Sequence, residues 1–157
     1  MKEYLLLYRL KLDHYVSLDK KYKHISLSVL KFVLSSDFRP NEEDFLNQVV
    51  SCYNVSFIYH DFENNMLYVG RADWELDEEI ACPSDDEFPH YVNDTNSCRM
   101  TVNNYLEFRK QWMQLKQDLF PFALIYRENN DWVDCKGFET QQEMEAFVQQ
   151  NQQEIIH

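Results

Sequence analysis

Glycine is almost absent from this sequence of 157 residues, which contains only Gly70 and Gly137. Phosphate-binding loops and dinucleotide-binding turns need several glycines close together, because their backbone must approach the ligand without a Cβ atom. The four cysteines are also far apart, and no pair has the C-x-x-C spacing of common zinc and dithiol motifs. The sequence therefore argues against an enzyme built on a nucleotide-binding loop.

Long hydrophobic runs are missing as well. No stretch reaches the roughly 18 consecutive apolar residues that a membrane-spanning helix needs. The apolar run in MKEYLLLYRLKLD is interrupted by Arg9 and Lys11 too early for the core of a signal peptide. We therefore expect a cytoplasmic protein with reduced thiols and no membrane partner.

Positive charge is lacking from one segment. Residues 73–94, DWELDEEIACPSDDEFPHYVND, contain nine acidic residues and no Lys or Arg, so they supply −9 of the formal net charge of −12. Residues 1–40, in contrast, have eight basic and four acidic residues. An acidic surface attracts basic partners and repels nucleic acid and anionic lipid. The acidic segment therefore predicts a basic protein as the partner and no direct binding of nucleic acid.

Apolar residues make up 45% of the chain, which predicts a folded protein rather than a disordered one. Runs in which apolar residues alternate with polar ones favour β-strands, and Asn-containing turns between two such runs favour hairpins. The two N-terminal runs would form an opening hairpin. Strands are expected over residues 4–18, 24–34, 55–61, 66–72, 98–102, 122–128 and 132–138. At the start of the first run, Leu5 and Leu7 interrupt the polar face, so a helix there stays an alternative.

Three helices are predicted from capping residues and apolar spacing. Asn41 is a favourable N-cap, Asn104 has Glu107 at the capping-box position, and Thr140 has Glu143 at the equivalent position. The expected apolar faces contain Phe45, Val49 and Cys52 in the first helix, Tyr105, Phe108, Trp112, Leu115 and Leu119 in the second, and Met144, Phe147 and Val148 in the third.

Together these elements predict an α+β fold, with a mainly antiparallel sheet of about seven strand segments and three helices packed on it. A chain of this length suits one domain, so we expect a single domain over residues 1–157. A long acidic loop would occupy residues 73–97, and its early part, WELDEEI, could form a short helix. Loops of this length within a compact domain are often functional or disordered.

Two groups of residues could indicate a metal site. Cys82, His90 and Cys98 could ligate zinc, with Cys52 or His60 as a fourth ligand, but their spacing is not that of a known zinc motif. The acidic residues between Asp73 and Glu79 resemble a calcium-binding loop, but they lack its glycine and its closing glutamate. We therefore expect no metal and no cofactor.

Catalytic residues are not indicated either. Cys52 or Cys135 could be a nucleophile only with a base and an orienting group beside it, and the five histidines are scattered without a local signature. Packing explains both cysteines, because we expect them on a helix face and within a strand. We therefore expect that the protein is not an enzyme.

The acidic segment is the candidate site because apolar residues are interleaved with its carboxylates. Aromatic side chains beside desolvated charge are typical of protein–protein interfaces. A solvated, mobile loop is the alternative. The residues expected to bind the partner are Asp73, Trp74, Glu75, Asp77, Glu78, Glu79, Asp85, Asp86, Glu87, Phe88 and Tyr91.

The order of elements resembles a known class of proteins. Residues 104–148 contain a capped helix with a central Trp112, the hairpin LIYRENNDWVDCK and a short capped helix, and VSFIYHDFENNMLYVG forms an earlier hairpin. This layout is similar to that of small bacterial immunity proteins, the antidotes of polymorphic or contact-dependent growth-inhibition toxins. The resemblance implies a monomer or weak dimer that binds a basic toxin domain, such as a nuclease, and occludes its active site.

The residues alone also leave a second function open. An acidic DNA mimic or regulatory adaptor would bind a nucleic-acid-binding protein with carboxylates arranged in rows like phosphates. The net basic character of residues 1–40 argues against this alternative.

Overall fold

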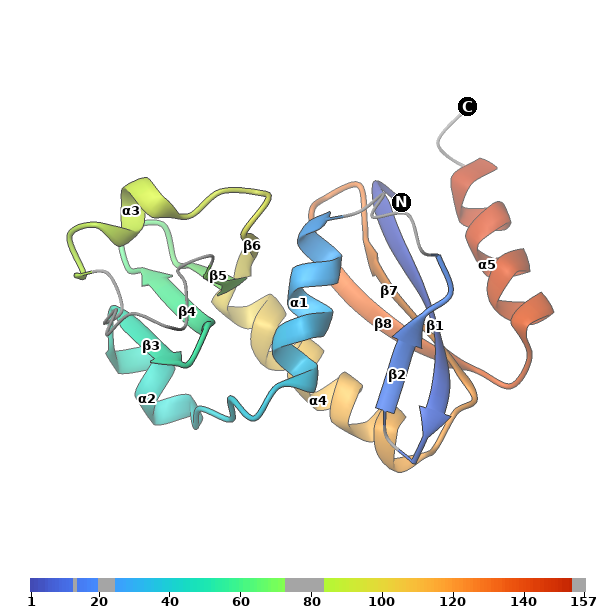
Figure 1. The fold of residues 1–157 in the computed structure, drawn as a ribbon. Helices are drawn as coiled ribbons and strands as arrows, with labels where there is room; N and C mark the ends of the chain where they lie inside the picture. The colour runs from blue at the N-terminus through green and yellow to red at the C-terminus, as the bar shows by residue number, and fades with distance from the viewer. Residues whose placement is uncertain (13, 20–24, 73–83, 154–157) are drawn as a thin grey trace. The chain divides into compact units, whose positions relative to one another are not determined.

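The computed structural model describes residues 1–12, 14–19, 25–72 and 84–153. The chain forms two compact units: unit 1 contains Met1–Leu27 and Asn103–His157, and unit 2 contains Ser28–Val102. Among the described residues there are five helices and two antiparallel four-stranded sheets, which confirms the predicted α+β class (Figure 1). The sheet residues are divided between two sheets rather than one. The expectation of a single domain stays a prediction.

The sheet of unit 1 has the strand order β2-β1-β7-β8. Its strands are β1 (Glu3–Lys11), β2 (His14–Ser17), β7 (Phe122–Arg127) and β8 (Val133–Phe138). The hairpin of β7 and β8 confirms the prediction for that part of the sequence. The single strand expected over 4–18 instead turns back and pairs with itself as β1 and β2.

The predicted strand over 24–34 is wrong, because helix α1 occupies Ile25–Ser35. The alternation of Ile25, Leu27 and Val29 covers only a few residues and suggested a strand. Leu27, Leu30 and Val33, three residues apart, are the ones that become buried. This spacing places them along one side of a helix.

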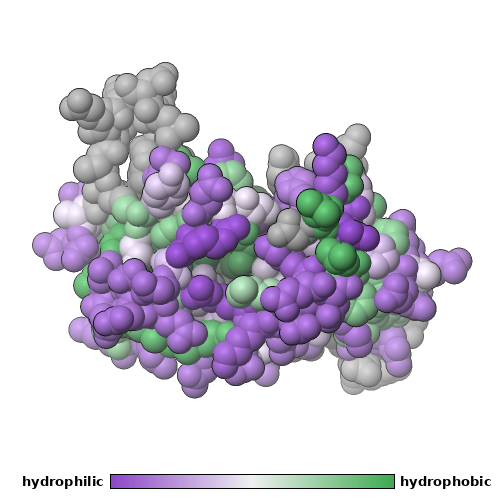
Figure 2. All heavy atoms as spheres, turned by 90° about the horizontal axis from the view of Figure 1, so that it is seen from below, coloured by the Kyte–Doolittle hydropathy of each residue, from purple (hydrophilic) through white to green (hydrophobic). Residues whose placement is uncertain are grey.

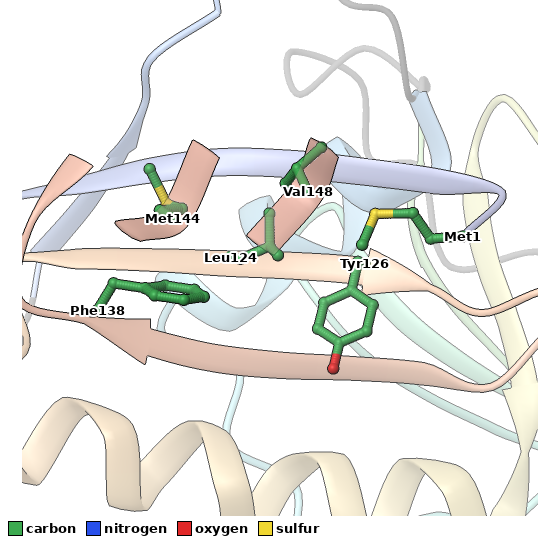
Figure 3. Close-up of a cluster of buried hydrophobic side chains, with 6 residues drawn as sticks. All are labelled: Met1, Leu124, Tyr126, Phe138, Met144 and Val148. Atoms are coloured by element: carbon green, nitrogen blue, oxygen red, sulfur yellow. The ribbon is translucent and has the colours of Figure 1, made fainter. Parts of the chain in front are cut away.

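Two helices cover opposite faces of the unit 1 sheet. Tyr105, Phe108, Trp112 and Leu115 of α4 (Val102–Gln117) are buried as predicted, and the Trp112 ring lies 5.5 Å from that of Tyr15 on β2. Leu119, predicted for the same face, is exposed beyond the end of α4. On the other face, α5 (Gln141–Gln153) packs into the cluster that Figure 3 shows. Its members are Met1, Leu124, Tyr126, Phe138, Met144 and Val148.

The cap predicted for α5 is confirmed, since the Thr140 hydroxyl oxygen accepts a hydrogen bond from the Glu143 amide at 3.2 Å. The cap predicted for α2 (Glu42–Asn47) is confirmed too, because Asn41 accepts from the Asp44 amide at 2.8 Å. However, α2 ends before Val49 and Cys52. Cys52 lies on a strand and is exposed, so its predicted place on the apolar face of this helix is wrong.

The sheet of unit 2 has the order β3-β4-β5-β6. Its strands are β3 (Val50–Tyr53), β4 (Ser56–Asp61), β5 (Met66–Arg71) and β6 (Ser97–Thr101). The predicted hairpin of β4 and β5 and the predicted short strand near residue 98 are both confirmed. Asn54 and Asn65 each take a positive φ, of 54° and 53°, in the turns that begin and end β4. Asparagine tolerates this backbone conformation better than most residues.

Asn104 does not cap a helix, which corrects the prediction. Helix α4 begins two residues earlier, and the Asn104 side chain, only 1% exposed, reaches the edge strand β8. Its amide nitrogen donates to the Val133 carbonyl and its oxygen accepts from the Val133 N–H, both at 2.7 Å. The side chain thus occupies the backbone groups that a further strand would use, and it protects this edge of the sheet.

Replacing Asn104 with alanine should therefore destabilise unit 1. The change leaves two buried backbone groups of Val133 without partners, at a cost of about 2 to 4 kcal/mol in the free energy of unfolding. Urea denaturation measures this cost. Asn103→Ala is the matched control, because Asn103 is exposed on the same helix turn. Equal stability of the two variants would contradict the role assigned to Asn104.

Candidate partner-binding surface

Five of the predicted partner-binding residues belong to the part of the chain that the structure describes: Asp85, Asp86, Glu87, Phe88 and Tyr91. The other six, Asp73, Trp74, Glu75, Asp77, Glu78 and Glu79, lie outside the described residues, as does the short helix expected in WELDEEI. We refer to the segment 84–92 as the acidic turn.

The acidic turn is locally ordered by its own hydrogen bonds. The Glu87 amide donates to the Ser84 carbonyl at 2.9 Å, and the Ser84 hydroxyl donates to the Glu87 carboxylate at 3.0 Å. A short helix, α3 (Phe88–Tyr91), follows, with Pro89 in its first turn. Proline suits this position because the first amides of a helix have no partner within it. Pro89 therefore helps to start a helix instead of interrupting a loop.

Phe88 is not a surface residue, which corrects its predicted role in binding. The side chain is fully buried, with 0% exposed. Its ring centroid lies 5.2 Å from that of Phe57 and 6.0 Å from that of Tyr59, both on β4. Tyr91, half-buried, lies 6.0 Å from Phe57 and 5.8 Å from Phe88. The two aromatic residues of the acidic turn therefore attach it to one face of the unit 2 sheet.

Gly70 makes room for this attachment. It pairs with Phe57 across β4 and β5, and a Cβ atom on Gly70 would lie 2.2 Å from the Phe57 ring and 2.6 Å from the Asn96 carbonyl oxygen. No side chain fits at such distances, so the ring of Phe57 can lie over the strand only because residue 70 is a glycine.

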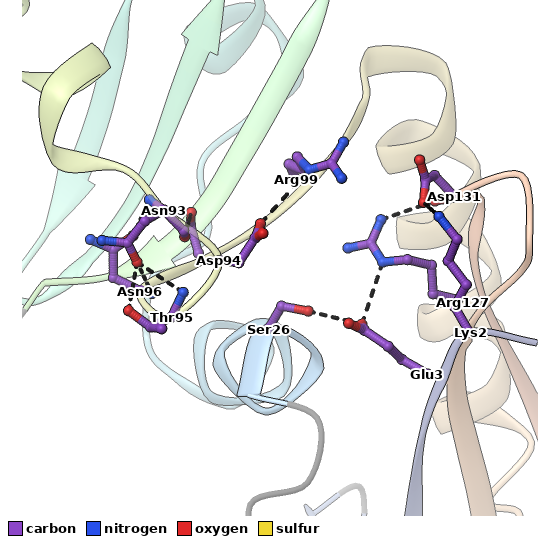
Figure 4. A network of polar contacts seen from close by, with 11 residues as sticks. Lys2, Glu3, Ser26, Asn93, Asp94, Thr95, Asn96, Arg99, Arg127 and Asp131 are labelled. Atoms are coloured by element: carbon purple, nitrogen blue, oxygen red, sulfur yellow. Dashed lines mark hydrogen bonds and ion pairs between the residues drawn. The ribbon is translucent and has the colours of Figure 1, made fainter.

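The end of the acidic turn is fixed to β6 by an asparagine turn (Figure 4). The Asn93 side-chain oxygen accepts from the Thr95 and Asn96 amides at 2.8 and 3.0 Å. The Asn96 side chain donates in turn to the Tyr91 carbonyl at 2.8 Å. Within the same turn, Asp94 forms an exposed ion pair with Arg99 at 3.8 Å. Aromatic packing and these hydrogen bonds thus hold both sides of α3.

Three carboxylates remain on the outside of this structure. Asp85, Asp86 and Glu87 are exposed, and none of them forms an ion pair with a Lys or Arg of the described residues. Buried aromatic side chains below and exposed carboxylates above give a surface of fixed negative charge. Such a surface favours a positively charged partner.

Asp61 and Glu63 extend the negative charge towards the turn between β4 and β5. The pKa of Tyr59 is raised by burial first and then by the nearby charges of Asp61, Tyr68 and Glu63. Because Tyr59 also stacks on Phe88, Asp61, two residues further along β4, lies on the face that carries the acidic turn, and Glu63 lies in the turn after the strand. Sequence reasoning missed them, although the period of two along β4 puts Asp61 on the same face as Phe57 and Tyr59.

The zinc ligands considered from the sequence are not brought together. Cys98 is a buried free thiol on β6, paired with Val69 and hence on the face opposite to Phe57. His90 belongs to α3, which covers the Phe57 face, and Cys82 lies outside the described residues. Within the described ranges, no group of three His, Cys, Asp or Glu residues could hold a metal ion.

The remaining cysteines have different environments. Burial, and then the charge of Asp134, raise the pKa of the Cys135 thiol strongly, whereas a nucleophilic cysteine needs a lowered pKa. Cys52 is disulfide-bonded, so the prediction of reduced thiols is wrong for this residue.

No helix among the described residues has the length and hydrophobicity to cross a bilayer.

Truncating Phe88 tests whether it is a core residue, as the structure shows, or a surface residue available to a partner, as the sequence predicted. As a core residue, Phe88→Ala should lower the free energy of unfolding by about 3 to 5 kcal/mol, as measured by chemical denaturation. Phe62→Ala is the control in the turn directly after β4, because the Phe62 side chain is 51% exposed, and it should cost less than about 1 kcal/mol. If Phe88→Ala kept full stability, Phe88 would not belong to the core.

Comparison with known proteins identifies no relative of the chain. No protein-family model, no curated protein and no solved structure matches it. The chemistry of the candidate surface is therefore argued from its own residues: a row of exposed carboxylates attached through buried aromatic side chains to the sheet of unit 2.

Proposed function

We propose that this chain is an immunity protein, which binds and neutralises a basic toxin domain, such as a nuclease, through the acidic surface of unit 2. The observation that carries the proposal is the exposure of Asp85, Asp86 and Glu87 without a cationic partner among the described residues, on a turn held by the buried Phe88. The acidic residues from Asp73 to Glu79 lie outside the described residues and stay predicted partner-binding residues by their charge alone.

The partner's chemistry follows from that of the surface. A nuclease binds phosphates with positively charged side chains, and carboxylates at matching positions can form ion pairs with the same side chains. A net charge of −12 also increases the rate of encounter with a basic partner. Because the acidic turn is already folded, its backbone loses little conformational freedom on binding, which improves affinity.

The proposal assigns no catalysis, metal or cofactor to the chain. It needs only that the acidic surface covers the positively charged site of the toxin. The raised pKa of Cys135 supports this assignment, because a protonated buried thiol is a poor nucleophile.

The test is the rate at which the chain associates with the product of a neighbouring toxin-like gene. Replacing Asp85 and Asp86 with asparagine and Glu87 with glutamine should slow association about tenfold at low salt and less at high salt, since electrostatic attraction is screened by ions. Stopped-flow or surface-based kinetics measure this rate.

The matched control is the triple variant Glu107→Gln, Asp118→Asn, Glu139→Gln. It removes the same amount of charge from exposed residues of unit 1. Equal slowing in both variants would mean that only net charge matters, and it would contradict the assigned surface. Binding of the wild-type chain to unrelated DNA-binding proteins, without preference for the toxin, would favour a DNA mimic instead.

A further inference from the structure

Strand β3 forms one edge of the unit 2 sheet, and its pairing with β4 sets the direction of its backbone groups (Figure 1). The His60 amide donates to the Val49 carbonyl at 2.8 Å, so hydrogen bonds join residue 49 with 60, 51 with 58 and 53 with 56. Val50 lies between two of these pairs, so its N–H and C=O point away from β4. Among the described residues, neither group forms a hydrogen bond. Asn104 occupies the β8 edge of the other sheet, whereas the β3 edge is open at Val50.

An open groove lies beside this edge of the sheet. It is lined by β3, by the loop of residues 37–40 and by α2, and its volume of about 580 Å³ is within the range of about 300 to 1,000 Å³ that is typical of ligand sites. The His60 ring nitrogen lies 3.3 Å from the Phe45 carbonyl oxygen, so α2 packs on the face to which the side chains of residues 56, 58 and 60 point. The acidic turn packs on the opposite face, against Phe57 and Tyr59. The groove is therefore a different surface from the acidic turn.

The charge of the groove favours a basic occupant. Asp37 and Asp44 line it as exposed carboxylates, and neither forms an ion pair with a Lys, Arg or His that the structure describes. Arg39 lines the groove too, but its guanidinium donates to the carbonyls of residues 36 and 38 in its own loop. Unit 2 as a whole contains fifteen acidic and four basic residues, which attracts a cation.

Tyr53 adds an aromatic ring to the groove. It pairs with Ser56, so its side chain points to the face that carries α2, and it is 54% exposed. A Lys or Arg side chain can form ion pairs with carboxylates and lie over the face of a tyrosine ring. The groove therefore combines a backbone edge, which suits an extended chain, with side chains that suit a basic residue.

We propose that this groove binds an extended, basic segment of a partner protein, which adds a strand to the sheet beside Val50 and places a Lys or Arg beside Asp37, Asp44 and Tyr53. In this mode of recognition, main-chain hydrogen bonds supply affinity and alternate side chains supply specificity. The face seen in Figure 2 is mainly hydrophilic, with small hydrophobic areas, which suits such a partner better than one that needs a broad apolar interface. A second copy of β3 suits the groove less well, because it would bring two acidic grooves together. This inference does not rest on the proposed function.

Titration of the isotope-labelled full-length chain with a synthetic peptide, followed by NMR, tests the proposal. The probe is a hexapeptide of alternating valine and arginine with both ends blocked. At physiological ionic strength, it should shift the amide signals of β3, which then report its affinity. The same peptide with every amide N-methylated keeps its charge but cannot donate to the strand edge, so it should bind at least about tenfold more weakly. Asp37→Asn with Asp44→Asn should weaken binding of the unmodified peptide about fivefold.

Asp85→Asn with Asp86→Asn is the matched control, because it removes the same charge from the acidic turn. It should change the affinity read at β3 by less than about twofold, since ions screen distant charges. The proposal is overturned if millimolar peptide leaves the β3 amides unshifted, if the N-methylated peptide binds equally well, or if both variants weaken binding equally. It is also overturned if the β3 amides shift with protein concentration in the absence of peptide, because the edge would then join two copies of the chain.

Discussion

The packing of Phe88 against Phe57, over Gly70, is the contact on which the candidate surface depends. Phe57 lies close to the neighbouring strand because Gly70 has no side chain, and this position lets Phe88 contact its ring at 5.2 Å. Burying a phenylalanine stabilises a fold by about 1.5 to 3 kcal/mol. The carboxylates of residues 85–87 gain a fixed position from this burial, although they contribute no packing themselves.

The contact also explains how strongly acidic residues can be part of a folded unit. Carboxylates close together repel one another, and in an isolated peptide this repulsion favours extended, solvated conformations. Here an aromatic side chain follows directly after three acids, Ser84 is hydrogen-bonded to Glu87 across them, and α3 and the Asn93 turn follow. The negative charge is therefore held on a folded scaffold, so that little order has to be created when a partner binds.

Local patterns predicted much of the fold correctly. The alternating runs gave β4, β5, β7 and β8, and the capping residues Asn41 and Thr140 gave the starts of α2 and α5. Each of these signals lies within a few residues of the element it describes. Helix α1 was missed because a short alternation of Ile, Ser and Leu is compatible with a strand, and only burial against other elements selects the helix.

The errors at the site have a different cause. Asn104 has the residue type and spacing of a helix cap, but its partner is Val133, 29 residues away. Phe88 resembles an interface residue because of its acidic neighbours, yet its partners are Phe57, 31 residues earlier, and Tyr59. Long-range contacts of this kind leave no local pattern. The exposed acids could be predicted from composition, whereas the buried residues that position them could not.

Amide hydrogen exchange of the chain without any partner is the most direct measurement of whether the acidic turn is folded in advance. The Tyr91 and Val92 amides donate to the carbonyls of Glu87 and Phe88 at 3.1 and 3.0 Å, next to the buried ring. We predict that both amides exchange much more slowly than in an unstructured peptide, with protection close to that of β4. Exchange of both amides at the rate of an unstructured peptide, while β4 stays protected, would contradict the account.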